Sequence, residues 1–453
     1  MTNLCSPLDH ILSLREAEQL NQPALSELRE KRMRMLLKHA FENSPFYKKL
    51  YTEQGITLEK IANQALSDFP FVNKPMLMSN FDEVITRPNL TRSEIDLFLA
   101  DPCTRGAKYK NEFQILHTSG TSGTIGVFVF APAEWTLIEA MAVTRVSRTK
   151  PLTDRKLRLS YVGATDGHYA GVSLALDAPT PFFESQILHI GRPLEEIIHD
   201  LNEFRPDTLS GYASGAQLLA EEALVGHLKI SPKKIICSGD PLTKPAREVI
   251  KSAFGVEPTN LYAATEALTM GADCEQEHRL HLFTDWHCFE IVDSNGRAVP
   301  NGTVGSLVVT NLYNKTMPLI RYHINDRMSI DSRPCPCGSP FPVLKEIGGR
   351  VEDPLWFKGK DGKRIMLQPI VIDFFIHGVS RFQFEQISPE AVILRIIGKG
   401  DIEKIAHNTE ERLVDILREH DLEKTVKVSI EMVSEIKNDP RTGKARTIIG
   451  YKW

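Results

Sequence analysis

The segment HTSGTSGTIG, residues 117–126, consists mostly of glycine and hydroxyl residues. Such a loop can hold phosphate, because glycines let backbone N–H groups converge on an anion and the hydroxyls add further donors. A P-loop would end in Gly-Lys-Ser or Gly-Lys-Thr and lead into a helix. This loop contains no lysine and lies between EFQIL and VFVFA, which both have the apolar pattern of strands. From composition alone, a plain hairpin connection therefore competes with a phosphate-binding loop.

Charged side chains recur in four later motifs. They are Glu266 in LYAATEA, Asp326 in RYHINDR, Arg350 in GGRVED and Lys444 in NDPRTGKARTI. The carboxylates could bind a cation or accept hydroxyl groups, and the two cations could neutralise an anion. Taken singly, none is specific, because a glutamate after a strand or a lysine in a loop is usually just solvated. An arginine such as Arg350 also often makes an ordinary ion pair between domains.

The elements that must position these residues follow from the hydrophobic pattern. Between Lys156 and Ala264, short β-branched runs such as KLRLSYV, PDTLSGY, KKIICSG and TNLYAA alternate with helical patterns, which is typical of an α/β sheet. After Arg279, the turns SNGR and PNGT separate apolar runs and predict a β-meander or a small barrel. From about Val351, strand-like and helical runs indicate a compact α+β module. Residues 50–107 mix short helical stretches with prolines and predict no definite elements.

Composition restricts the class of partner. The chain has 453 residues, which suggests two or three cores, and its net charge of −4 gives no basic field for nucleic acid. No span approaches the roughly 20 apolar residues of a membrane helix, and the opening residues are charged where a signal peptide is apolar. We therefore expect a cytoplasmic protein that acts on a small molecule, with no nucleic-acid or membrane partner, as a monomer or homodimer.

The five motifs, taken in order, resemble the adenylate-forming superfamily of acyl-CoA synthetases and peptide-synthetase adenylation domains. NSPFYKKL, LSGYASGAQLLAEEA, PLIRY and the CPCG before GGR look most like its phenylacetate–CoA ligase branch. The resemblance covers nearly the whole chain. It implies an α/β fold in which residues 1–349 form a large N-terminal domain with a meander or barrel subdomain. Residues 350–453 would form a small, mobile C-terminal α+β domain.

The activity that this resemblance implies is ATP-dependent conversion of a carboxylic acid to an acyl-adenylate, followed by transfer to the thiol of coenzyme A. Two alternatives stay open for the second step, a carrier-protein thiol and an amine, because the stretch PLWFKGKDGKRIMLQP after the hinge departs from the family pattern. A third alternative is a non-catalytic protein that binds a nucleotide or an acyl group. The hinge itself corresponds to Glu352.

The resemblance also implies a site for ATP and Mg²⁺. Tyr262 corresponds to the aromatic residue that stacks on adenine, and Glu266 to the carboxylate that holds Mg²⁺. Asp326 would accept the ribose hydroxyls, and Lys444 would reach the α-phosphate and the substrate carboxylate. The further residues implied are Thr118, Ser119, Gly120, Thr121, Ser122 and Gly123 in the phosphate loop, Ser238, Gly239 and Asp240 near adenine, Ala263 after the tyrosine, Thr265 at a phosphate and Arg350 near the ribose.

The acid would lie against YVGATDGHYAG and LSGYASG by the same resemblance. Aromatic residues in these segments suit an aryl acid, but they could equally be part of the core. The residues nominated are Tyr161, Gly163, His168, Tyr169, Tyr212 and Ser214.

The seven cysteines are scattered, except for the close pair in CPCG, and indicate reduced thiols with metal binding as an open question. Some phenylacetate–CoA ligase relatives carry a cysteine and histidine zinc site in corresponding segments. The resemblance then implies a structural Zn²⁺ on Cys274, Cys335, Cys337 and His281, with His278 as the rival of His281. Ligands of this softness suit tetrahedral zinc. Reduced cysteines without a metal are the alternative.

Overall fold

The computed structural model describes residues 6–118, 125–148, 155–180, 182–348, 355–360, 362–367, 372, 379–398, 400–436 and 448–451. Several residues of the predicted site lie outside these ranges, and their roles remain predictions. They are Ser119, Gly120, Thr121, Ser122, Gly123, Arg350, Glu352 and Lys444.

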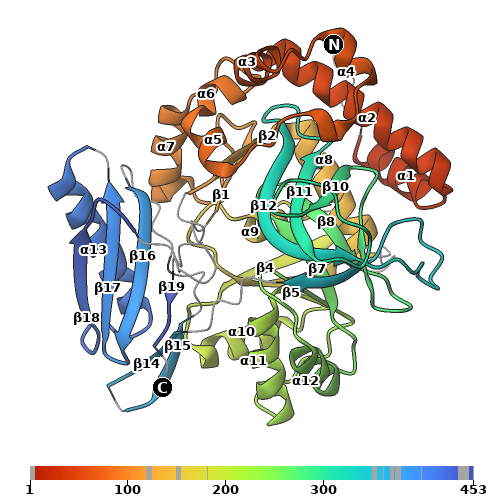
Figure 1. The fold of residues 1–453 in the computed structure, drawn as a ribbon. Coiled ribbons are helices and arrows are strands. Elements are labelled where there is room, and N and C mark those ends of the chain that lie inside the picture. Colours follow the sequence, from red (N-terminus) through yellow and green to blue (C-terminus); the bar gives the residue numbers. More distant parts are fainter. Residues whose placement is uncertain are drawn as a thin grey trace.

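The N-terminal part is a series of helices that lies along one side of the molecule (Figure 1). The first three are α1 (Pro7–Ala17), α2 (Gln22–Asn43) and α3 (Pro45–Glu53). Each has a side-chain N-cap and a proline in its first turn, which is why the chain can end one helix and begin the next within a few residues. Shorter helices follow in the segment whose sequence predicted no definite elements: α4 (Leu58–Asn63), α5 (Lys74–Ser79), α6 (Phe81–Val84) and α7 (Arg92–Ala100).

A seven-stranded sheet forms the centre of the protein, with strand order β4-β3-β5-β6-β7-β8-β9. The first five strands of this order pair in parallel. Strand β8 then pairs antiparallel with β7, and β9 pairs antiparallel with β8. The strands are β3 (Leu157–Gly163), β4 (Phe183–His189), β5 (Thr208–Tyr212), β6 (Lys234–Ser238), β7 (Thr259–Ala264), β8 (Leu268–Asp273) and β9 (Leu280–Leu282). This confirms the predicted α/β sheet.

Helices cover both faces of this sheet. One face packs in a common core with α10 (Leu194–Phe204), α11 (Ala213–Leu224) and α12 (Lys244–Phe254). On the other face, α9 (Ala170–Leu176) joins a small aromatic core. Neighbouring residues of β3 show the alternation, since Val162 belongs to the first core and Tyr161 to the second.

The hydroxyl-rich loop connects two strands, as predicted. Strands β1 (Gln114–His117) and β2 (Val127–Phe130) pair antiparallel, and His117 lies opposite Val127. Helix α8 (Pro132–Met141) follows directly and continues into a π-helical segment, η3 (Ala142–Ser147).

The segment after Arg279 forms an open antiparallel meander with strand order β10-β11-β12-β13. Its strands are β10 (His287–Val292), β11 (Gly305–Asn311), β12 (Leu319–Ile330) and β13 (Leu344–Gly348). The meander prediction is confirmed and the barrel alternative is wrong, because within the described residues the outer strands β10 and β13 do not pair with each other.

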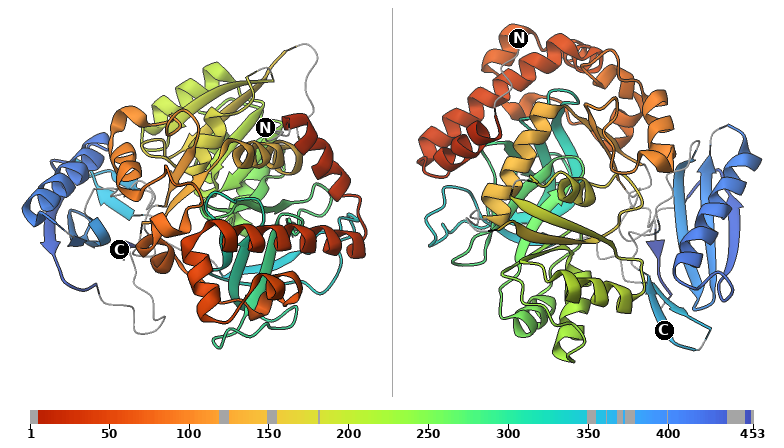
Figure 2. Two further views of the ribbon diagram at one scale, coloured as in Figure 1. Left: turned by 90° about the horizontal axis from the view of Figure 1, so that it is seen from above. Right: turned by 180° about the vertical axis from the view of Figure 1, so that it is seen from behind.

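Residues after Leu355 have a hydrophobic core of their own. Helix α13 (Ile402–Glu419) packs on a four-stranded sheet of order β18-β17-β16-β19, and a hairpin of β14 (Leu355–Lys358) and β15 (Arg364–Leu367) precedes it. The sheet strands are β16 (Val379–Ser388), β17 (Ala391–Gly398), β18 (Lys427–Met432) and β19 (Ile448–Ile449). This C-terminal unit lies to one side of the rest of the chain (Figures 1 and 2).

The C-terminal unit meets the central sheet at a seam that contains charged groups. Arg412 of α13 forms an ion pair with Asp166, and the two side chains are 22% and 9% exposed. Glu419 Oε2 lies 3.9 Å from His189 Nε2, and Ile190 contacts the cores on both sides. The seam is therefore held by charge as well as by apolar packing.

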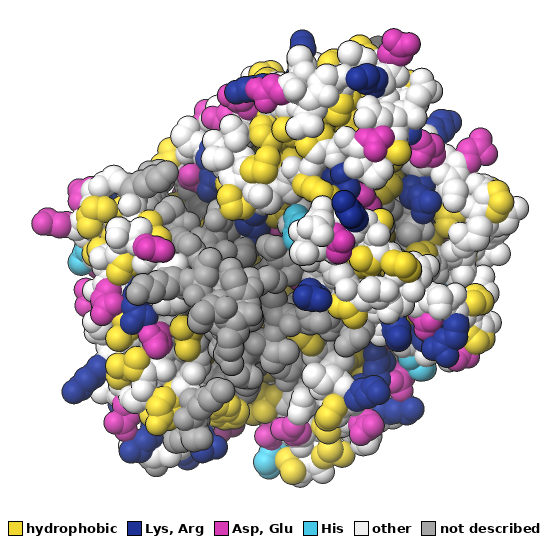
Figure 3. Space-filling view, in the orientation of Figure 1, with side chains coloured by type: hydrophobic (Ala, Val, Ile, Leu, Met, Phe, Trp, Pro, Cys, Tyr) yellow, Lys and Arg dark blue, Asp and Glu magenta, His cyan; other side chains and the backbone are white. Residues whose placement is uncertain are grey.

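The surface carries both signs of charge. On the face in Figure 3, acidic and basic side chains alternate over the described part without forming a field of one sign. Within that part of the chain, no helix has the length and apolar content needed to cross a bilayer.

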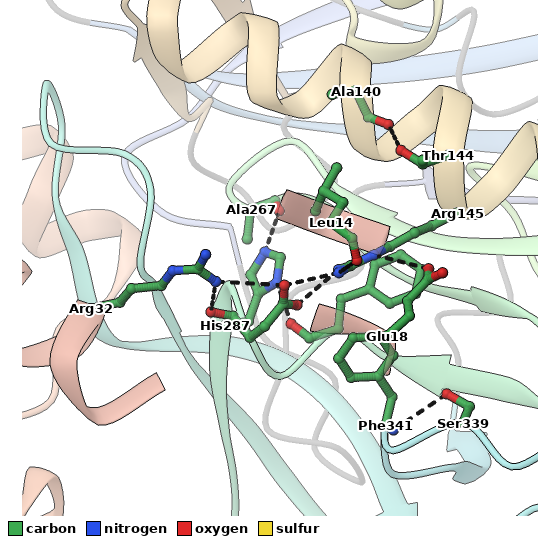
Figure 4. Close-up of polar contacts among 12 residues, drawn as sticks. Leu14, Glu18, Arg32, Ala140, Thr144, Arg145, Ala267, His287, Ser339 and Phe341 are labelled. Atoms are coloured by element: carbon green, nitrogen blue, oxygen red, sulfur yellow. Dashed lines mark hydrogen bonds and ion pairs between the residues drawn. The ribbon is translucent and has the colours of Figure 1, made fainter. Parts of the chain in front are cut away.

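A buried ion cluster ties the N-terminal helices to the core (Figure 4). Arg145 bonds both carboxylate oxygens of Asp285, at 2.8 and 2.9 Å, and all of these groups are fully buried. Arg32 of α2 lies 3.5 Å from the same carboxylate, and Glu18 lies 3.4 Å from Arg145 Nε. Two arginines and two carboxylates thus balance, as buried charges require. Burial alone would raise the pKa of Asp285, but the guanidinium groups outweigh it and hold the pKa below its ordinary value.

Asp285→Asn should destabilise the protein strongly, because it leaves Arg145 buried without its counter-charge. Breaking a buried pair in this way costs about 3–5 kcal/mol, which urea denaturation at pH 7 would measure. Since the pKa of Asp285 is lowered, the contribution is fully present above its ordinary value of 3.8 and is lost only as the pH falls below it. Glu196→Gln, in the exposed Arg192–Glu196 pair, is the control and should cost less than about 1 kcal/mol. Equal losses in the two variants would contradict this account.

Candidate active site

Glu266 lies at the tip of a hairpin, in the turn between β7 and β8, and is buried to 7% exposure. Its Oε1 lies 3.1 Å from the ammonium of Lys74 and accepts a hydrogen bond from the Tyr322 hydroxyl at 3.2 Å. Lys74 Nζ also donates to Thr118 Oγ1 at 3.5 Å. A helix start, a strand of the meander and the beginning of the hydroxyl-rich loop therefore converge on one carboxylate.

Sequence reasoning missed Lys74 and Tyr322. Lys74 occurs in FVNKPML as an isolated lysine, and lysines of this kind are almost always exposed. Here it is 8% exposed at the first position of α5. The apolar residues near Lys74 in the sequence could have indicated that it is buried. They could not have identified Glu266, far along the chain, as its partner.

The ends of the hydroxyl-rich loop are fixed to each other. Thr118 N donates to Gly126 O at 2.9 Å, and Gly126 N donates to Thr118 Oγ1 at 2.9 Å. A Cβ on Gly126 would lie 2.7 Å from the Phe128 ring and 3.3 Å from Lys74 Cδ, so glycine is needed for this close approach. The loop therefore begins and ends directly beside Lys74.

Tyr262 and Asp326, predicted for adenine and ribose, are in contact. The Tyr262 hydroxyl donates to Asp326 Oδ2 at 2.8 Å. Tyr322 and Asp326 lie four residues apart on β12, where its pairing with β11 is irregular. The structure therefore brings Tyr262, Glu266 and Asp326 to one region, with Ala263, Ala264 and Thr265 in the connecting hairpin.

Asp240, predicted near adenine, caps a helix. Its carboxylate accepts from the backbone N–H groups of Ala213 at 2.5 Å and Ser214 at 3.1 Å, at the start of α11. Burial raises its pKa above the ordinary value, although these donors oppose the change. Ser238 is the last residue of β6, and Gly239 has a φ of 81°, a left-handed backbone that glycine adopts without strain. Asp240 follows directly and caps α11.

Three of the residues predicted for the acid lie in a buried aromatic cluster. Tyr161, Tyr169 and Tyr212 pack with alanines and Val172 on one face of the sheet. The Tyr161 hydroxyl would lie 2.4 Å from a Cβ at Gly163, so the glycine makes room for the ring. Tyr212 Oη accepts from Ala164 N at 3.2 Å.

His168 of the same segment contacts the strand that leads into the hydroxyl-rich loop. Its backbone N–H donates to His117 Nε2 at 3.2 Å, and His117 N donates to His168 O at 3.1 Å. Because His117 Nε2 accepts, its proton resides on Nδ1. Burial lowers the pKa of both histidines to about 4, so both are neutral at pH 7. The predicted acid segment and the loop are thus mechanically connected.

A second site is formed by Cys274, His281, Cys335 and Cys337, whose ligand atoms all lie within 4.8 Å of one another. Cys274 Sγ and Cys335 Sγ are 3.9 Å apart, and His281 Nε2 lies 3.4 Å from Cys337 Sγ. Tetrahedral zinc, with Zn–S of about 2.3 Å and Zn–N of about 2.0 Å, gives S–S and S–N separations of about 3.8 and 3.5 Å. His281 Nδ1 lies 2.8 Å from Phe341 O, which directs the bare Nε2 at the sulfurs.

The four residues come from three segments of the chain. Cys274 follows β8, His281 lies in β9, and the CPCG cysteines lie in the connection from β12 to β13. His278, the alternative to His281, does not belong to this group. Within the described residues, this is the one group of three or more side chains placed to bind a metal ion together. An ion held here would join the central sheet to the meander.

Comparisons with known proteins agree with this architecture. No family model matches the chain. It is 26% identical over 354 residues to phenylacetate–coenzyme A ligase from Thermus thermophilus, covering 76% of this chain and 74% of that protein. It is 25% identical over 362 residues to phenylacetate–coenzyme A ligase from Pseudomonas putida, with coverages of 76% and 74%.

Among solved structures, 2-hydroxyisobutyryl-CoA ligase in complex with 2-HIB-AMP and CoA matches with a TM-score of 0.62 at 21% identity, over 96% of this chain and 91% of that chain. The curated relatives support the predicted adenylate-forming superfamily and its phenylacetate–CoA ligase-like branch, and the solved structure supports the fold. The predicted family and fold class of this adenylate-forming protein are thus confirmed.

Proposed function

We propose that this adenylate-forming protein activates a carboxylic acid with ATP and then transfers the acyl group to coenzyme A. The observation that carries the proposal is the convergence of Glu266, Lys74 and Thr118 beside the contact between Tyr262 and Asp326. A polar, buried site with one cation, one carboxylate and a hydroxyl-rich loop suits a polyphosphate. The acid is proposed to be aryl, since curated relatives are named phenylacetate–coenzyme A ligases and the segments predicted to contact the acid contribute buried aromatic side chains.

In the first step, a carboxylate oxygen attacks the α-phosphorus of ATP, forms the acyl-adenylate and releases pyrophosphate. The nucleophile is already ionised, so the task of the protein is to bring two anions together and neutralise their charge. Lys74 supplies a positive charge from the described part of the chain, and Lys444 is proposed to supply another. In the second step, the thiol sulfur attacks the acyl carbon and AMP leaves.

Glu266 fits a magnesium ligand by its chemistry. Mg²⁺ is usually held by one or two carboxylates together with phosphate oxygens, and Glu266 is a buried carboxylate beside the hydroxyl-rich loop. When bound, Mg²⁺ would withdraw charge from the phosphates. The ribose hydroxyls are proposed to bind Asp326, which Tyr262 orients.

The domain division at residues 349 and 350, with Glu352 as the hinge, is also part of the proposal. It is supported by the separate core of the residues after Leu355 and by the polar seam with Asp166. A C-terminal unit with its own core can turn as a body.

The exchange of radiolabelled pyrophosphate into ATP tests the activity directly. With Mg²⁺ and a panel of aryl and alkyl acids, we expect exchange that depends on at least one acid. Adding coenzyme A to the best acid should give the acyl-CoA thioester and AMP. The absence of exchange with every acid would contradict the proposed adenylation. Exchange without thioester formation would contradict the role of coenzyme A and favour a carrier-protein thiol or an amine.

Lys74→Met should lower kcat/KM for ATP by about 10- to 100-fold, equivalent to about 1.4–2.7 kcal/mol, because a buried positive charge at the phosphates is lost. Initial exchange rates over a range of ATP concentrations measure this. Lys110→Met is the matched control, since Lys110 also pairs with a glutamate but is 44% exposed on the surface. An unchanged kcat/KM in the Lys74 variant would show that its ammonium does not act on the nucleotide.

We propose that Cys274, Cys335, Cys337 and His281 hold a structural Zn²⁺, which would supply folding free energy as a closed tetrahedral centre. Elemental analysis of the purified protein should find about one zinc per chain. Cys337→Ser and His281→Ala should lose the metal and lower the melting temperature. His278→Ala and Cys103→Ser, an exposed cysteine, should retain it. Full zinc content in the Cys337 variant would contradict the assignment.

A further inference from the structure

The carbonyl of Ala267, directly after Glu266, lies within hydrogen-bonding distance of two buried side chains. The Tyr313 hydroxyl donates to it at 2.9 Å, and His287 Nε2 lies 3.0 Å from it. His287 is fully buried and Tyr313 is 5% exposed. Neither side chain belongs to the predicted nucleotide site, yet both act on the turn that carries its carboxylate.

That turn has a conformation which its own sequence does not favour. Ala267 N donates to Ala264 O at 3.0 Å, and Ala264 lies opposite Leu268 across the hairpin. A loop of three residues, 265–267, is thereby closed. Leu268, the first residue of β8 after this loop, has a φ of 40°, a left-handed backbone that glycine adopts more easily than leucine. A non-glycine residue keeps such a backbone only when its surroundings hold it there.

The two side chains are themselves held firmly. The rings of His287 and Tyr313 pack edge to face, with centroids 5.6 Å apart. His287 Nδ1 faces Phe283 O at 3.1 Å, so the single N–H of the neutral ring can be donated to only one of the two carbonyls. His287 lies two residues after Asp285 and therefore close to the buried ion cluster (Figure 4).

We propose that Tyr313 and His287 are positioning residues for Glu266. By bonding Ala267 O, they hold the strained turn so that the Glu266 carboxylate stays directed at Lys74 and at the metal-bound phosphates. This inference rests on the proposed function. Mg²⁺ demands near-ideal ligand geometry, so a displaced carboxylate should weaken Mg²⁺-dependent binding of ATP more than binding of the acid.

Tyr313→Phe tests this, because it removes one hydroxyl and leaves the ring. Titration calorimetry with ATP, in Mg²⁺ and in EDTA, gives the factor by which Mg²⁺ strengthens binding. We expect this factor to fall about fivefold, the size of one lost hydrogen bond, while the KM for the acid changes less than about twofold. His287→Gln, the second variant, should lower the same factor.

Tyr47→Phe is the matched control, since the Tyr47 hydroxyl is equally buried and donates to Pro318 O at 2.9 Å. It should lose similar stability and keep the wild-type Mg²⁺ factor. If the Tyr313 and His287 variants also keep that factor, their side chains have a structural role only and the inference is wrong. Failure of the proposed function is distinguishable, because then the wild type itself would show neither Mg²⁺-dependent ATP binding nor exchange.

Discussion

The pairing of the Glu266 carboxylate with the Lys74 ammonium organises the site. Both groups are nearly excluded from water, and either one alone would be costly to bury. Their contact at 3.1 Å therefore requires that helix α5 and the β7–β8 hairpin meet. Once they meet, Thr118 and Tyr322 lie within hydrogen-bonding distance of the pair. The proposed site for an anionic ligand thus coincides with a pair that must neutralise its own charge inside the protein.

Opposite charges also neutralise each other in the buried ion cluster, deeper in the protein. Arg145, Asp285 and Arg32 join two N-terminal helices to the segment that leads into β10, and His287 continues from there to the carbonyl after Glu266. Paired buried charges favour a unique arrangement, since a displacement leaves a charge without its partner. This cluster lies close to the hairpin turn whose backbone is strained at Leu268.

The sequence predicted the elements whose periodicity is strong, and it failed where contacts are non-local. Short β-branched runs such as KLRLSYV, separated by helical patterns, identified the sheet strands, but α4 to α7 are too short to show a helical period. The turns SNGR and PNGT indicated antiparallel strands, whereas closure into a barrel depends on whether distant strands pair. The cap formed by Asp240 and the burial of Lys74 each depend on a partner far along the chain. Motif order found the family, which single residues did not.

The seam with the C-terminal unit has a consequence for communication along the chain. Asp166 directly precedes the segment Gly167–Tyr169, and its carboxylate forms an ion pair with Arg412 of α13. A ligand that displaced this segment would also move Asp166, one partner of the ion pair. The position of the C-terminal unit would then depend on whether the proposed acid site is occupied. Because the Arg412–Asp166 ion pair is largely shielded from solvent, dissolved salt would weaken this coupling only slightly.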